Sequence, residues 1–247
     1  MFALKGKTVL VTGAAKRLGR YTALELARAG CRVIVHYRSS KEDAEATAEE
    51  IGRYGVEAWT IQADLEDTDS ARDLFGRCVE RAGPIDFLIN SASIFPEGTL
   101  PDVLTDAFEQ NMRVNALSPY ALAAALAEQG RPGSVVNFLD ARMLDYDRRH
   151  VPYHLSKRTL FTLTRIMAVE FAPLVRVNGV APGLVLPPDG EDESYLERLA
   201  HTNPLNTAGS GDQIAKTVLF LLWNEFVTGQ VIYVDGGRHL KGRFYGS

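Results

Sequence analysis

A phenol and an amine stand four residues apart in this sequence, at Tyr153 and Lys157. In a helix that spacing puts both side chains on one face, with their Cβ atoms about 6 Å apart. An ammonium group favours the phenolate and lowers a phenol pKa that starts at about 10, so the pair could make Tyr153 a proton donor. The same spacing also arises often by chance, and an ordinary helix face is the alternative.

A second candidate is a glycine-containing loop, TGAAKRLG at residues 12–19, which follows a β-branched run. Such a turn lets backbone amides and the positive end of the next helix face a pyrophosphate, and glycine permits the close approach. Two glycines six residues apart are weak evidence, since an ordinary strand-to-helix turn has the same pattern. Whether the loop binds a pyrophosphate therefore depends on the strands and helices predicted around it.

Short β-branched runs alternate along the chain with longer helical patterns. The predicted strands are Thr8–Val11, Arg32–His36, Glu57–Ile61, Asp86–Ile89, Ser134–Phe138, Val175–Val180 and Val231–Val234. The predicted helices are Leu18–Ala29, Ser40–Tyr54, Asp69–Ala82, Leu104–Glu128, Pro152–Phe171 and Gly211–Trp223. This alternation implies parallel pairing and predicts an α/β fold, a single doubly wound Rossmann-type domain with a seven-stranded parallel sheet flanked by helices. Ligands of such sheets bind at the carboxyl ends of the strands, where the strand order reverses.

Nothing in the sequence marks a second domain, because no repeat, low-complexity tract or flexible linker interrupts the pattern; residues 1–247 are predicted to form one domain. One long irregular piece, residues 183–210, is expected to be a substrate loop, since such stretches in compact domains are usually lids or binding loops. A solvated excursion with a short helix at Ser194–Ala200 is the alternative. Tyr195 is expected either to line the substrate pocket or to lie on the buried face of that helix.

The composition excludes several classes of protein. The 247 residues carry 27 Lys and Arg against 31 Asp and Glu, without the basic excess expected of a nucleic-acid binder. Apolar stretches such as Ala121–Ala127 and Val218–Trp223 are far too short to cross a bilayer. The start, Met1–Lys7, shows no secretory signal, so a cytoplasmic location is expected. Cys31 and Cys78 lack the spacing of a metal site or a disulfide framework; no metal is predicted, and both thiols are expected to be buried.

The glycine loop resembles the TGxxxGxG fingerprint of short-chain dehydrogenases/reductases, with Arg17 where the middle glycine usually stands. With the His-Tyr-Arg-Ser turn at residues 36–39, it is similar to pteridine reductases, in which the arginine lies beside both the cofactor phosphate and the pterin. The C-terminal stretches 227–229 and 235–240 resemble the family's ending, particularly that of dihydromonapterin reductases. The resemblance covers essentially the whole chain, from the first strand to about Leu240.

The resemblance also implies a catalytic set. The family places a serine 13 residues before its catalytic tyrosine, a position held here by Asp140, and pteridine and dihydromonapterin reductases carry aspartate there. We therefore interpret Asp140, Tyr153 and Lys157 as one proton-delivery unit, suited to a carbon–nitrogen double bond that gains hydride on carbon and a proton on nitrogen. A loop acid that pairs with Arg142 or Arg148 is the alternative for Asp140.

Three further residues match the family. Asn115 matches the asparagine that supports the catalytic lysine through water, and Ser93 and Phe95 match residues with which pteridine reductases touch and cover the ring. A flat heterocycle between Phe95 and the nicotinamide would present its reducible bond to the hydride; a core phenylalanine is the alternative. The implied substrate-binding residues are Arg17, Ser93, Phe95, Asp140 and Tyr153.

The cofactor depends on the end of the second strand. An NAD-preferring site usually carries Asp or Glu there to bind the ribose hydroxyls, but this chain has no carboxylate between that strand and Glu42. Arg38 and Arg17 can hold an additional phosphate through charge-assisted hydrogen bonds, so NADP(H) is predicted, with a solvated Arg38 as the alternative. The family resemblance implies the rest of the cofactor site, at residues 64–65, 90–93, 182–183 and 185. The predicted cofactor-binding residues are Gly13, Arg17, Leu18, Gly19, His36, Tyr37, Arg38, Ser39, Ser40, Asp64, Leu65, Asn90, Ser91, Ala92, Ser93, Tyr153, Lys157, Pro182, Gly183 and Val185. Asp64 could equally be a turn or helix-capping acid.

These features predict an NADPH-dependent reductase that converts a dihydropterin to a tetrahydropterin. The alternatives are a reductase of another carbonyl or quinone and, from a different class, a non-catalytic NADP(H)-binding sensor. The expected partner is a small-molecule substrate, with no nucleic acid and no membrane. Because family members pack the helices that hold Asn115 and Tyr153 against a second copy, a homo-oligomer, dimer or tetramer, is also expected.

Overall fold

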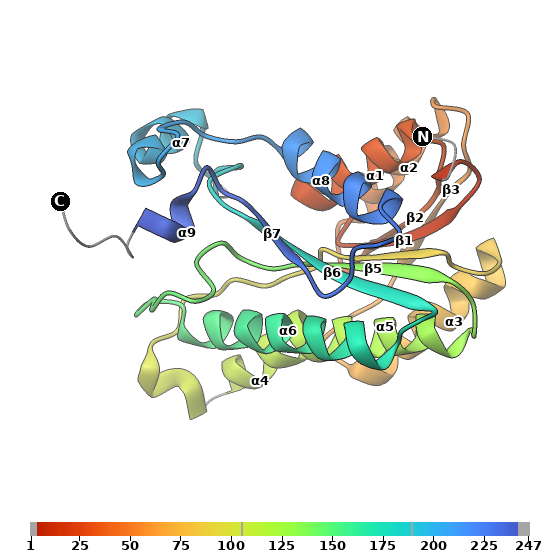
Figure 1. The fold of residues 1–247 in the computed structure, drawn as a ribbon, viewed down its shortest axis with the longest axis horizontal. Coiled ribbons are helices and arrows are strands. Elements are labelled where there is room, and N and C mark those ends of the chain that lie inside the picture. The colour runs from red at the N-terminus through yellow and green to blue at the C-terminus, as the bar shows by residue number, and fades with distance from the viewer. Residues whose placement is uncertain (1–3, 105, 189, 242–247) are drawn as a thin grey trace.

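Seven parallel strands form one sheet in the order β3-β2-β1-β4-β5-β6-β7 (Figure 1). The structure, a computed structural model, describes residues 4–104, 106–188 and 190–241, so both ends of the predicted domain 1–247 lie outside the described residues. The strands are β1 (Thr8–Thr12), β2 (Arg32–Tyr37), β3 (Ala58–Gln62), β4 (Phe87–Asn90), β5 (Gly133–Phe138), β6 (Val175–Pro182) and β7 (Val231–Val234). The predicted doubly wound sheet is confirmed. Its order reverses between β1 and β4, where such sheets bind ligands.

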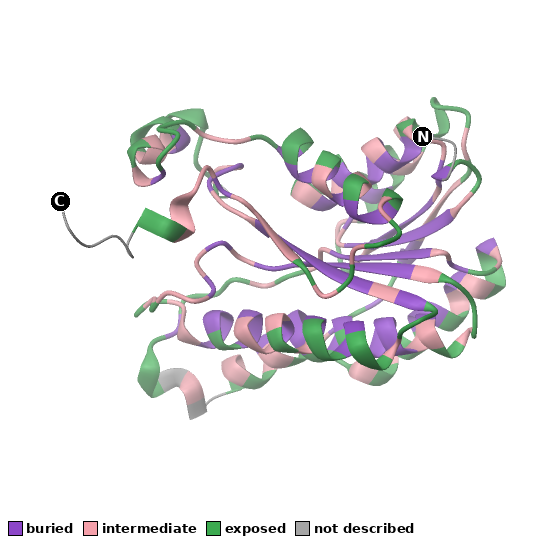
Figure 2. Cartoon of the chain, viewed as in Figure 1, coloured by how far each residue is buried: buried purple, intermediate pink, exposed green. Residues whose placement is uncertain are grey.

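Helices cover both faces of the sheet. On one face lie α1 (Arg17–Arg28), α2 (Lys41–Gly52) and α8 (Gly211–Trp223); on the other lie α3 (Thr68–Ala82), α4 (Asp106–Met112), α5 (Ser118–Glu128) and α6 (Val151–Glu170) (Figure 1). Successive β1 residues divide between two cores: Val9 and Val11 pack with α1 and α8, and Leu10 packs with α3 and α5. Because both faces are covered, the central strands are buried apolar runs (Figure 2).

The predicted helix Leu104–Glu128 begins later in the structure than predicted, and its interior is interrupted. A 3-10 turn occupies Leu100–Leu104, α4 begins at Asp106, and one π-helical turn, Arg113–Leu117, separates α4 from α5. The turn contains Asn115. Single π-helical turns inserted in α-helices are frequent at functional sites, and a 3.6-residue periodicity does not reveal them.

The long segment after β6 contains the short helix α7 (Glu193–Leu199), close to the predicted one. Tyr195 on α7 lies under the Arg198 guanidinium, 5.6 Å from its ring centroid, and does not line the main cavity of the described chain. The last described helix is α9 (Arg238–Lys241). Within the described ranges, no helix is long and apolar enough to cross a membrane.

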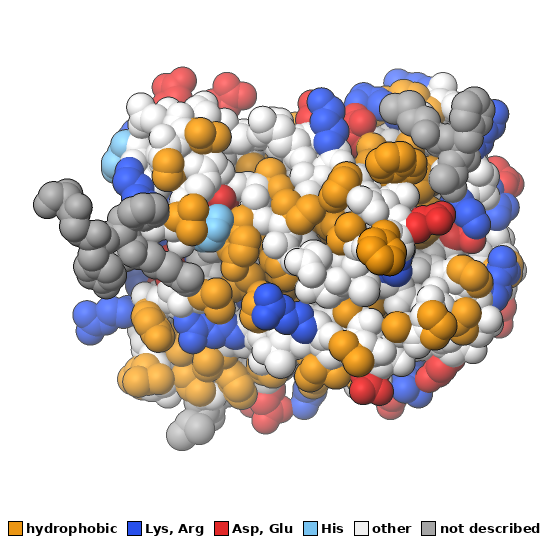
Figure 3. All heavy atoms as spheres, viewed as in Figure 1, with side chains coloured by type: hydrophobic (Ala, Val, Ile, Leu, Met, Phe, Trp, Pro, Cys, Tyr) orange, Lys and Arg blue, Asp and Glu red, His pale blue; other side chains and the backbone are white. Residues whose placement is uncertain are grey.

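Both cysteines are buried and free, as predicted, and they lie in different cores: Cys31 on the α1 side of the sheet and Cys78 on the α3 side. Burial raises the pKa of each thiol to about 12. On the molecular surface, acidic and basic side chains are mixed over the face drawn in Figure 3. That mixture agrees with the nearly balanced charge of the chain.

Candidate active site

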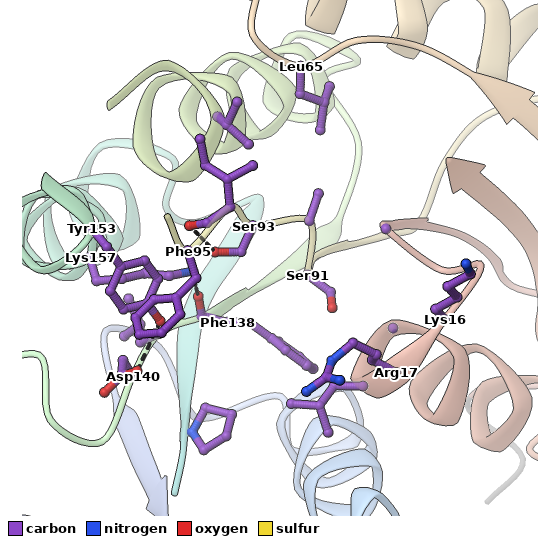
Figure 4. Close-up of a pocket in the computed structure, with 18 of the residues that line it drawn as sticks. Lys16, Arg17, Leu65, Ser91, Ser93, Phe95, Phe138, Asp140, Tyr153 and Lys157 are labelled. Atoms are coloured by element: carbon purple, nitrogen blue, oxygen red, sulfur yellow. Dashed lines mark hydrogen bonds between the residues drawn. The ribbon is translucent and has the colours of Figure 1, made fainter. Parts of the chain in front are cut away.

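A cavity of about 520 Å³ opens at the carboxyl ends of the strands. The predicted residues that line it are Gly13, Arg17, Leu18, Gly19, His36, Arg38, Asp64, Leu65, Ser91, Ala92, Ser93, Phe95, Asp140, Tyr153, Lys157, Pro182, Gly183 and Val185. At one end of this pocket lie Asp140, Tyr153, Lys157 and Phe95, and Lys16 and Arg17 lie towards the other (Figure 4). The fold thus brings the predicted proton-delivery and phosphate-binding residues to one pocket.

Five predicted residues, all within the described chain, do not line the cavity. The Asn90 side chain donates to the Pro119 carbonyl and to Asn137, so it joins β4 to β5 and α5 beneath the site. Tyr37 packs against the core under α1. Ser39 and Ser40 form the turn into α2, and the fifth, Asn115, lies behind the cavity wall.

The lining also contains residues that the sequence analysis did not assign to the site: Lys16, Ile94, Val114, Phe138, Leu139 and Leu186. Phe138 ends β5 and Leu139 follows it, so the rule that ligands bind at strand ends could have found both. Thr12 was also missed. Its Oγ1 accepts hydrogen bonds from the amides of Ser91 and Ala92 at 3.0 and 3.1 Å, which ties the end of β1 to the end of β4.

The geometry of the glycine loop fits a pyrophosphate. Gly13 has a φ of 64°, and a Cβ there would lie 2.9 Å from the Ala92 Cα; a Cβ at Gly19 would collide with the Gly13 carbonyl oxygen. Arg17 also adopts a left-handed φ, 52°, which explains why glycine is usual at this position. Within the described chain, the first turn of α1 lines the cavity and has no acidic residue and no side-chain cap, so no carboxylate of this turn would compete with an anion at the helix start.

His36 supports this loop from below. Its Nδ1 accepts a hydrogen bond from the Gly13 amide at 3.1 Å, and its Nε2 lies 3.2 Å from the Ala63 carbonyl, which fixes the proton on Nε2. Burial lowers the pKa of His36 to about 4, although the Ala63 hydrogen bond opposes the shift. His36 is therefore a neutral side chain that holds the Gly13 backbone in place at the edge of the pocket.

Acid is expected to destabilise the fold through His36. Its pKa is about 4 in the folded chain and about 6.5 in an unfolded one, so between these values the unfolded chain binds the additional proton. The His36 contribution to the free energy of unfolding is complete above about pH 6.5 and falls by roughly 2 to 3 kcal/mol as the pH decreases towards about 4. Urea titrations at about pH 7 and about pH 4.5 measure the loss. The variant His36→Asn, which keeps an acceptor but does not titrate, should lose less, and equal losses would contradict the assignment.

The proton-delivery residues meet at the end of β5. The Tyr153 hydroxyl donates to Asp140 Oδ2 at 2.9 Å, and Lys157, one turn further along α6, places its Nζ 5.7 Å from the Tyr153 ring centroid. The Lys157 ammonium donates to the Phe138 carbonyl at 2.8 Å. The helical spacing predicted for Tyr153 and Lys157 is confirmed.

The pKa of Tyr153 shifts opposite to the prediction. The predicted effect of the ammonium was a lower pKa, but burial raises it well above its usual value, and the Asp140 charge and hydrogen bond raise it further. Burial also lowers the pKa of Lys157 to about 8, with the Asp140 carboxylate opposing the shift. Tyr153 is therefore held as a protonated phenol, which is the form a proton donor needs.

Asp140 is also part of a local turn. Its Oδ1 accepts a hydrogen bond from the Arg142 amide at 2.6 Å, which leaves Oδ2 for Tyr153. The Arg142 side chain pairs instead with Asp145, with Nε 3.5 Å from Oδ2. Asp140 is thus a loop acid through one oxygen only, which binds the backbone of Arg142. Its other oxygen binds the Tyr153 hydroxyl, which the loop-acid alternative does not explain.

The buried Asn115 side chain holds the segment that carries Phe95. Its Oδ1 accepts from the Ile94 amide at 2.9 Å and its Nδ2 donates to the Ile94 carbonyl at 3.0 Å. The same carboxamide contacts the Ser93 and Ser156 hydroxyls at 3.1 Å. Through these hydrogen bonds, Asn115 positions Ser93 and Ile94, which form part of the pocket wall.

Phe95 is a surface residue of the cavity, not a core residue, with 56% of its area exposed. Its ring stacks on His150 with centroids 4.0 Å apart and an interplanar angle of 12°. It also meets Tyr153 edge to face, at 4.5 Å and 84°. The exposed Phe95 ring therefore lies directly beside Tyr153, the residue that would donate the proton.

A doubly wound parallel sheet, a glycine loop after β1 and a Tyr-Lys pair in a strand-end pocket define a dinucleotide-dependent oxidoreductase. Residues 13–239 match the family described as enoyl-(acyl carrier protein) reductase. Versicolorin reductase of Emericella nidulans is 32% identical over 96% of this chain and 97% of that protein, and the 3-oxoacyl-[acyl-carrier-protein] reductase FabG of Staphylococcus aureus is 31% identical over 95% and 98%. The crystal structure of FolM alternative dihydrofolate reductase 1 from Brucella canis, complexed with NADP, is 34% identical with a TM-score of 0.88, covering 98% of this chain and 96% of that one. The chain belongs to the short-chain dehydrogenase/reductase family.

Proposed function

We propose that this protein is an NADP(H)-dependent reductase that converts a dihydropterin to a tetrahydropterin. The observation that carries the proposal is the hydrogen bond from Tyr153 to Asp140 at the end of the pocket where the Phe95 ring lies exposed. A carboxylate beside the proton donor suits a ring that must receive its proton on nitrogen. The likeness to FolM supports this substrate class, because that protein is named as a dihydrofolate reductase and dihydrofolate is a pterin.

NADP(H) suits the other end of the pocket. The first-turn amides of α1, together with Arg17, would hold the pyrophosphate, and Arg38 would hold the additional phosphate. The sequence supports this choice, because no carboxylate stands between Arg38 and Glu42 to repel that phosphate. When bound, the reduced nicotinamide supplies a hydride.

The chain's own residues deliver the proton. When a carbon–nitrogen double bond takes the hydride on carbon, its π electron pair moves to nitrogen, which takes the proton of the Tyr153 hydroxyl. Asp140, 2.9 Å from that hydroxyl, orients it and can exchange a proton with it. The Lys157 charge stabilises the phenolate left behind. Tyr153 then regains a proton, so each turnover consumes one hydride and one proton.

Steady-state oxidation of NADPH tests the proposal, with dihydrobiopterin, dihydromonapterin and dihydrofolate as substrates and an acyl ketone for comparison. We expect turnover of at least one pterin, at a higher kcat/KM than for the ketone. Turnover of the ketone with none of the pterins would falsify the proposal.

The variant Arg38→Ala is expected to raise the KM for NADPH roughly 10- to 100-fold, because it removes charge-assisted hydrogen bonds to the phosphate. The KM for NADH should change little, since that cofactor lacks the phosphate. Arg53→Ala is the matched control: Arg53 is an exposed arginine next to the end of α2, paired with Glu49. An unchanged preference for NADPH over NADH in Arg38→Ala would count against the cofactor assignment.

A second candidate is the reduction of another carbonyl or quinone. It is favoured by the likeness to FabG, named as a 3-oxoacyl reductase, and to versicolorin reductase. The apolar lining residues Val114, Phe138 and Leu139 would accept such substrates too. The ketone in the substrate panel distinguishes the two candidates.

We also propose that residues 183–210 act as a substrate loop. Gly183 and Val185 line the pocket, and the Arg17 guanidinium donates to the Pro187 carbonyl at 2.8 Å, which ties the segment to the glycine loop.

A homo-oligomer is likewise proposed, because α6 leaves Leu155, Ile166 and Val169 exposed. Light scattering of the purified protein would measure its mass.

A further inference from the structure

The segment that carries Phe95 is fixed at both ends. Asn115 holds its start through both backbone groups of Ile94. Its end pairs with the turn before α6: the Gly98 amide donates to the Arg149 carbonyl at 2.7 Å, and the Val151 amide donates to the Gly98 carbonyl at 2.8 Å. An ion pair between Glu97 and Arg149 joins the same two segments. The backbone on either side of Phe95 is therefore tied to the body of the protein.

His150 supplies the remaining contact. It is the N-cap residue of α6, three residues before Tyr153, and its ring lies flat against Phe95. Only 16% of its side chain is exposed, and its Nδ1 lies 3.2 Å from Asp147 Oδ2. Asp147 is itself held, since its Oδ1 accepts from the Arg149 amide at 2.8 Å. The imidazole is thus fixed in orientation before it meets the phenyl ring.

Two contacts together define the plane of the Phe95 ring. His150 covers part of one face, and the edge-to-face contact with Tyr153 sets the ring at 84° to the phenol. His154 also approaches Asp147, with its Nε2 3.6 Å from Oδ2, and its ring meets Tyr153 edge to face at 5.7 Å. One carboxylate therefore serves the histidines on either side of the proton donor.

We infer that His150 is a positioning residue for the substrate ring: held by Asp147, it fixes the plane of Phe95 against which a flat heterocycle packs. The inference rests on the proposed function, in which Phe95 covers the pterin. A half-exposed phenylalanine without this support would lose rotamer freedom when substrate binds, and that entropy opposes binding. His150 removes the cost in advance, so its contribution belongs to the KM for the pterin and not to the chemical step.

The first test compares variants in the NADPH oxidation assay with the best pterin of the panel. His150→Ala is expected to raise the KM for the pterin about fivefold to twentyfold, with kcat and the KM for NADPH within about twofold. His150→Phe keeps a flat ring and should restore most of the loss. His201→Ala, at an exposed histidine in the 3-10 turn after α7, is the control and should leave all three constants unchanged. A fall in kcat alone would assign His150 to chemistry and overturn the inference.

A double-mutant cycle separates positioning from general structural damage. If His150 acts through Phe95, His150→Ala should have no further effect on the pterin KM in a Phe95→Ala background. Additive effects on the pterin KM would overturn the inference. So would a rise in the pterin KM of His150→Ala that is explained by a matching fall in its melting temperature. If the unmutated protein turns over no pterin, the proposed function is overturned as well. If it turns over a pterin but the effects of His150→Ala and Phe95→Ala on the pterin KM are additive, only the role of His150 is overturned.

Discussion

Replacing Tyr153 with phenylalanine will lower kcat by about 10²- to 10⁴-fold and leave the dissociation constant of NADPH within about twofold. The change removes one hydroxyl, the group that contacts Asp140 at 2.9 Å, and keeps the ring that packs against Phe95 and Lys157. Steady-state oxidation of NADPH measures kcat, and the fluorescence of bound NADPH measures binding. The effect is expected to be the largest of any conservative substitution in the pocket.

Tyr146→Phe is the matched control, because Tyr146 lies 89% exposed in the turn before α6 and its variant should keep parental turnover. A Tyr153→Phe protein with parental turnover would show that another group delivers the proton. A protein that binds NADPH but has no turnover before mutation would instead favour the sensor alternative.

The variant Asp140→Asn is expected to lower kcat for a pterin by about 10²-fold. Asparagine can still contact the Tyr153 hydroxyl, but it cannot exchange a proton with it. The substitution also removes the negative charge that helps to raise the pKa of Tyr153, so that pKa should fall, although burial still holds it up. Ultraviolet difference spectra of the tyrosinate across an alkaline titration measure the shift.

Asp145→Asn is the control for Asp140→Asn, because Asp145 follows in the same turn and pairs with Arg142. Asp140→Ser restores the serine that is usual in the family. We expect it to favour the acyl ketone over the pterin, since a serine hydroxyl can donate a hydrogen bond to a carbonyl oxygen but carries no negative charge at neutral pH with which to accept and return a proton as a carboxylate does. Parental kcat for the pterin in Asp140→Asn would contradict the assigned role.

The sequence predicts the sheet well because both of its faces are covered, so that each central strand is a continuous apolar run bounded by turns. The helix after β4 shows the limit of this approach. Its apolar pattern continues through Arg113–Leu117, and only hydrogen bonding in three dimensions reveals the π-helical turn at Asn115. The predicted start of that helix lies two residues before Asp106, because a periodic pattern fixes a helix end only to within a few residues.

The site residues that could be predicted are those attached to a motif or to a strand end, such as Gly13, Arg17 and Asp140. His150 carries no such signal, because its contact with Phe95 depends on pairing between Gly98 and the turn before α6. The direction of the Tyr153 pKa shift was also beyond the sequence. Spacing identifies a neighbouring ammonium, but only the folded chain shows that burial and the Asp140 carboxylate raise the pKa of Tyr153.

The placement of the two cysteines bears on how the protein responds to oxidants. Thiolates, not thiols, react with peroxides and alkylating agents, and a pKa of about 12 leaves almost no thiolate at neutral pH. Cys31 and Cys78 also lie on opposite faces of the sheet, too separated to bridge in the native fold. A change in the redox balance of the surroundings should therefore reach this enzyme through the ratio of reduced to oxidised dinucleotide and not through its two buried, protonated thiols.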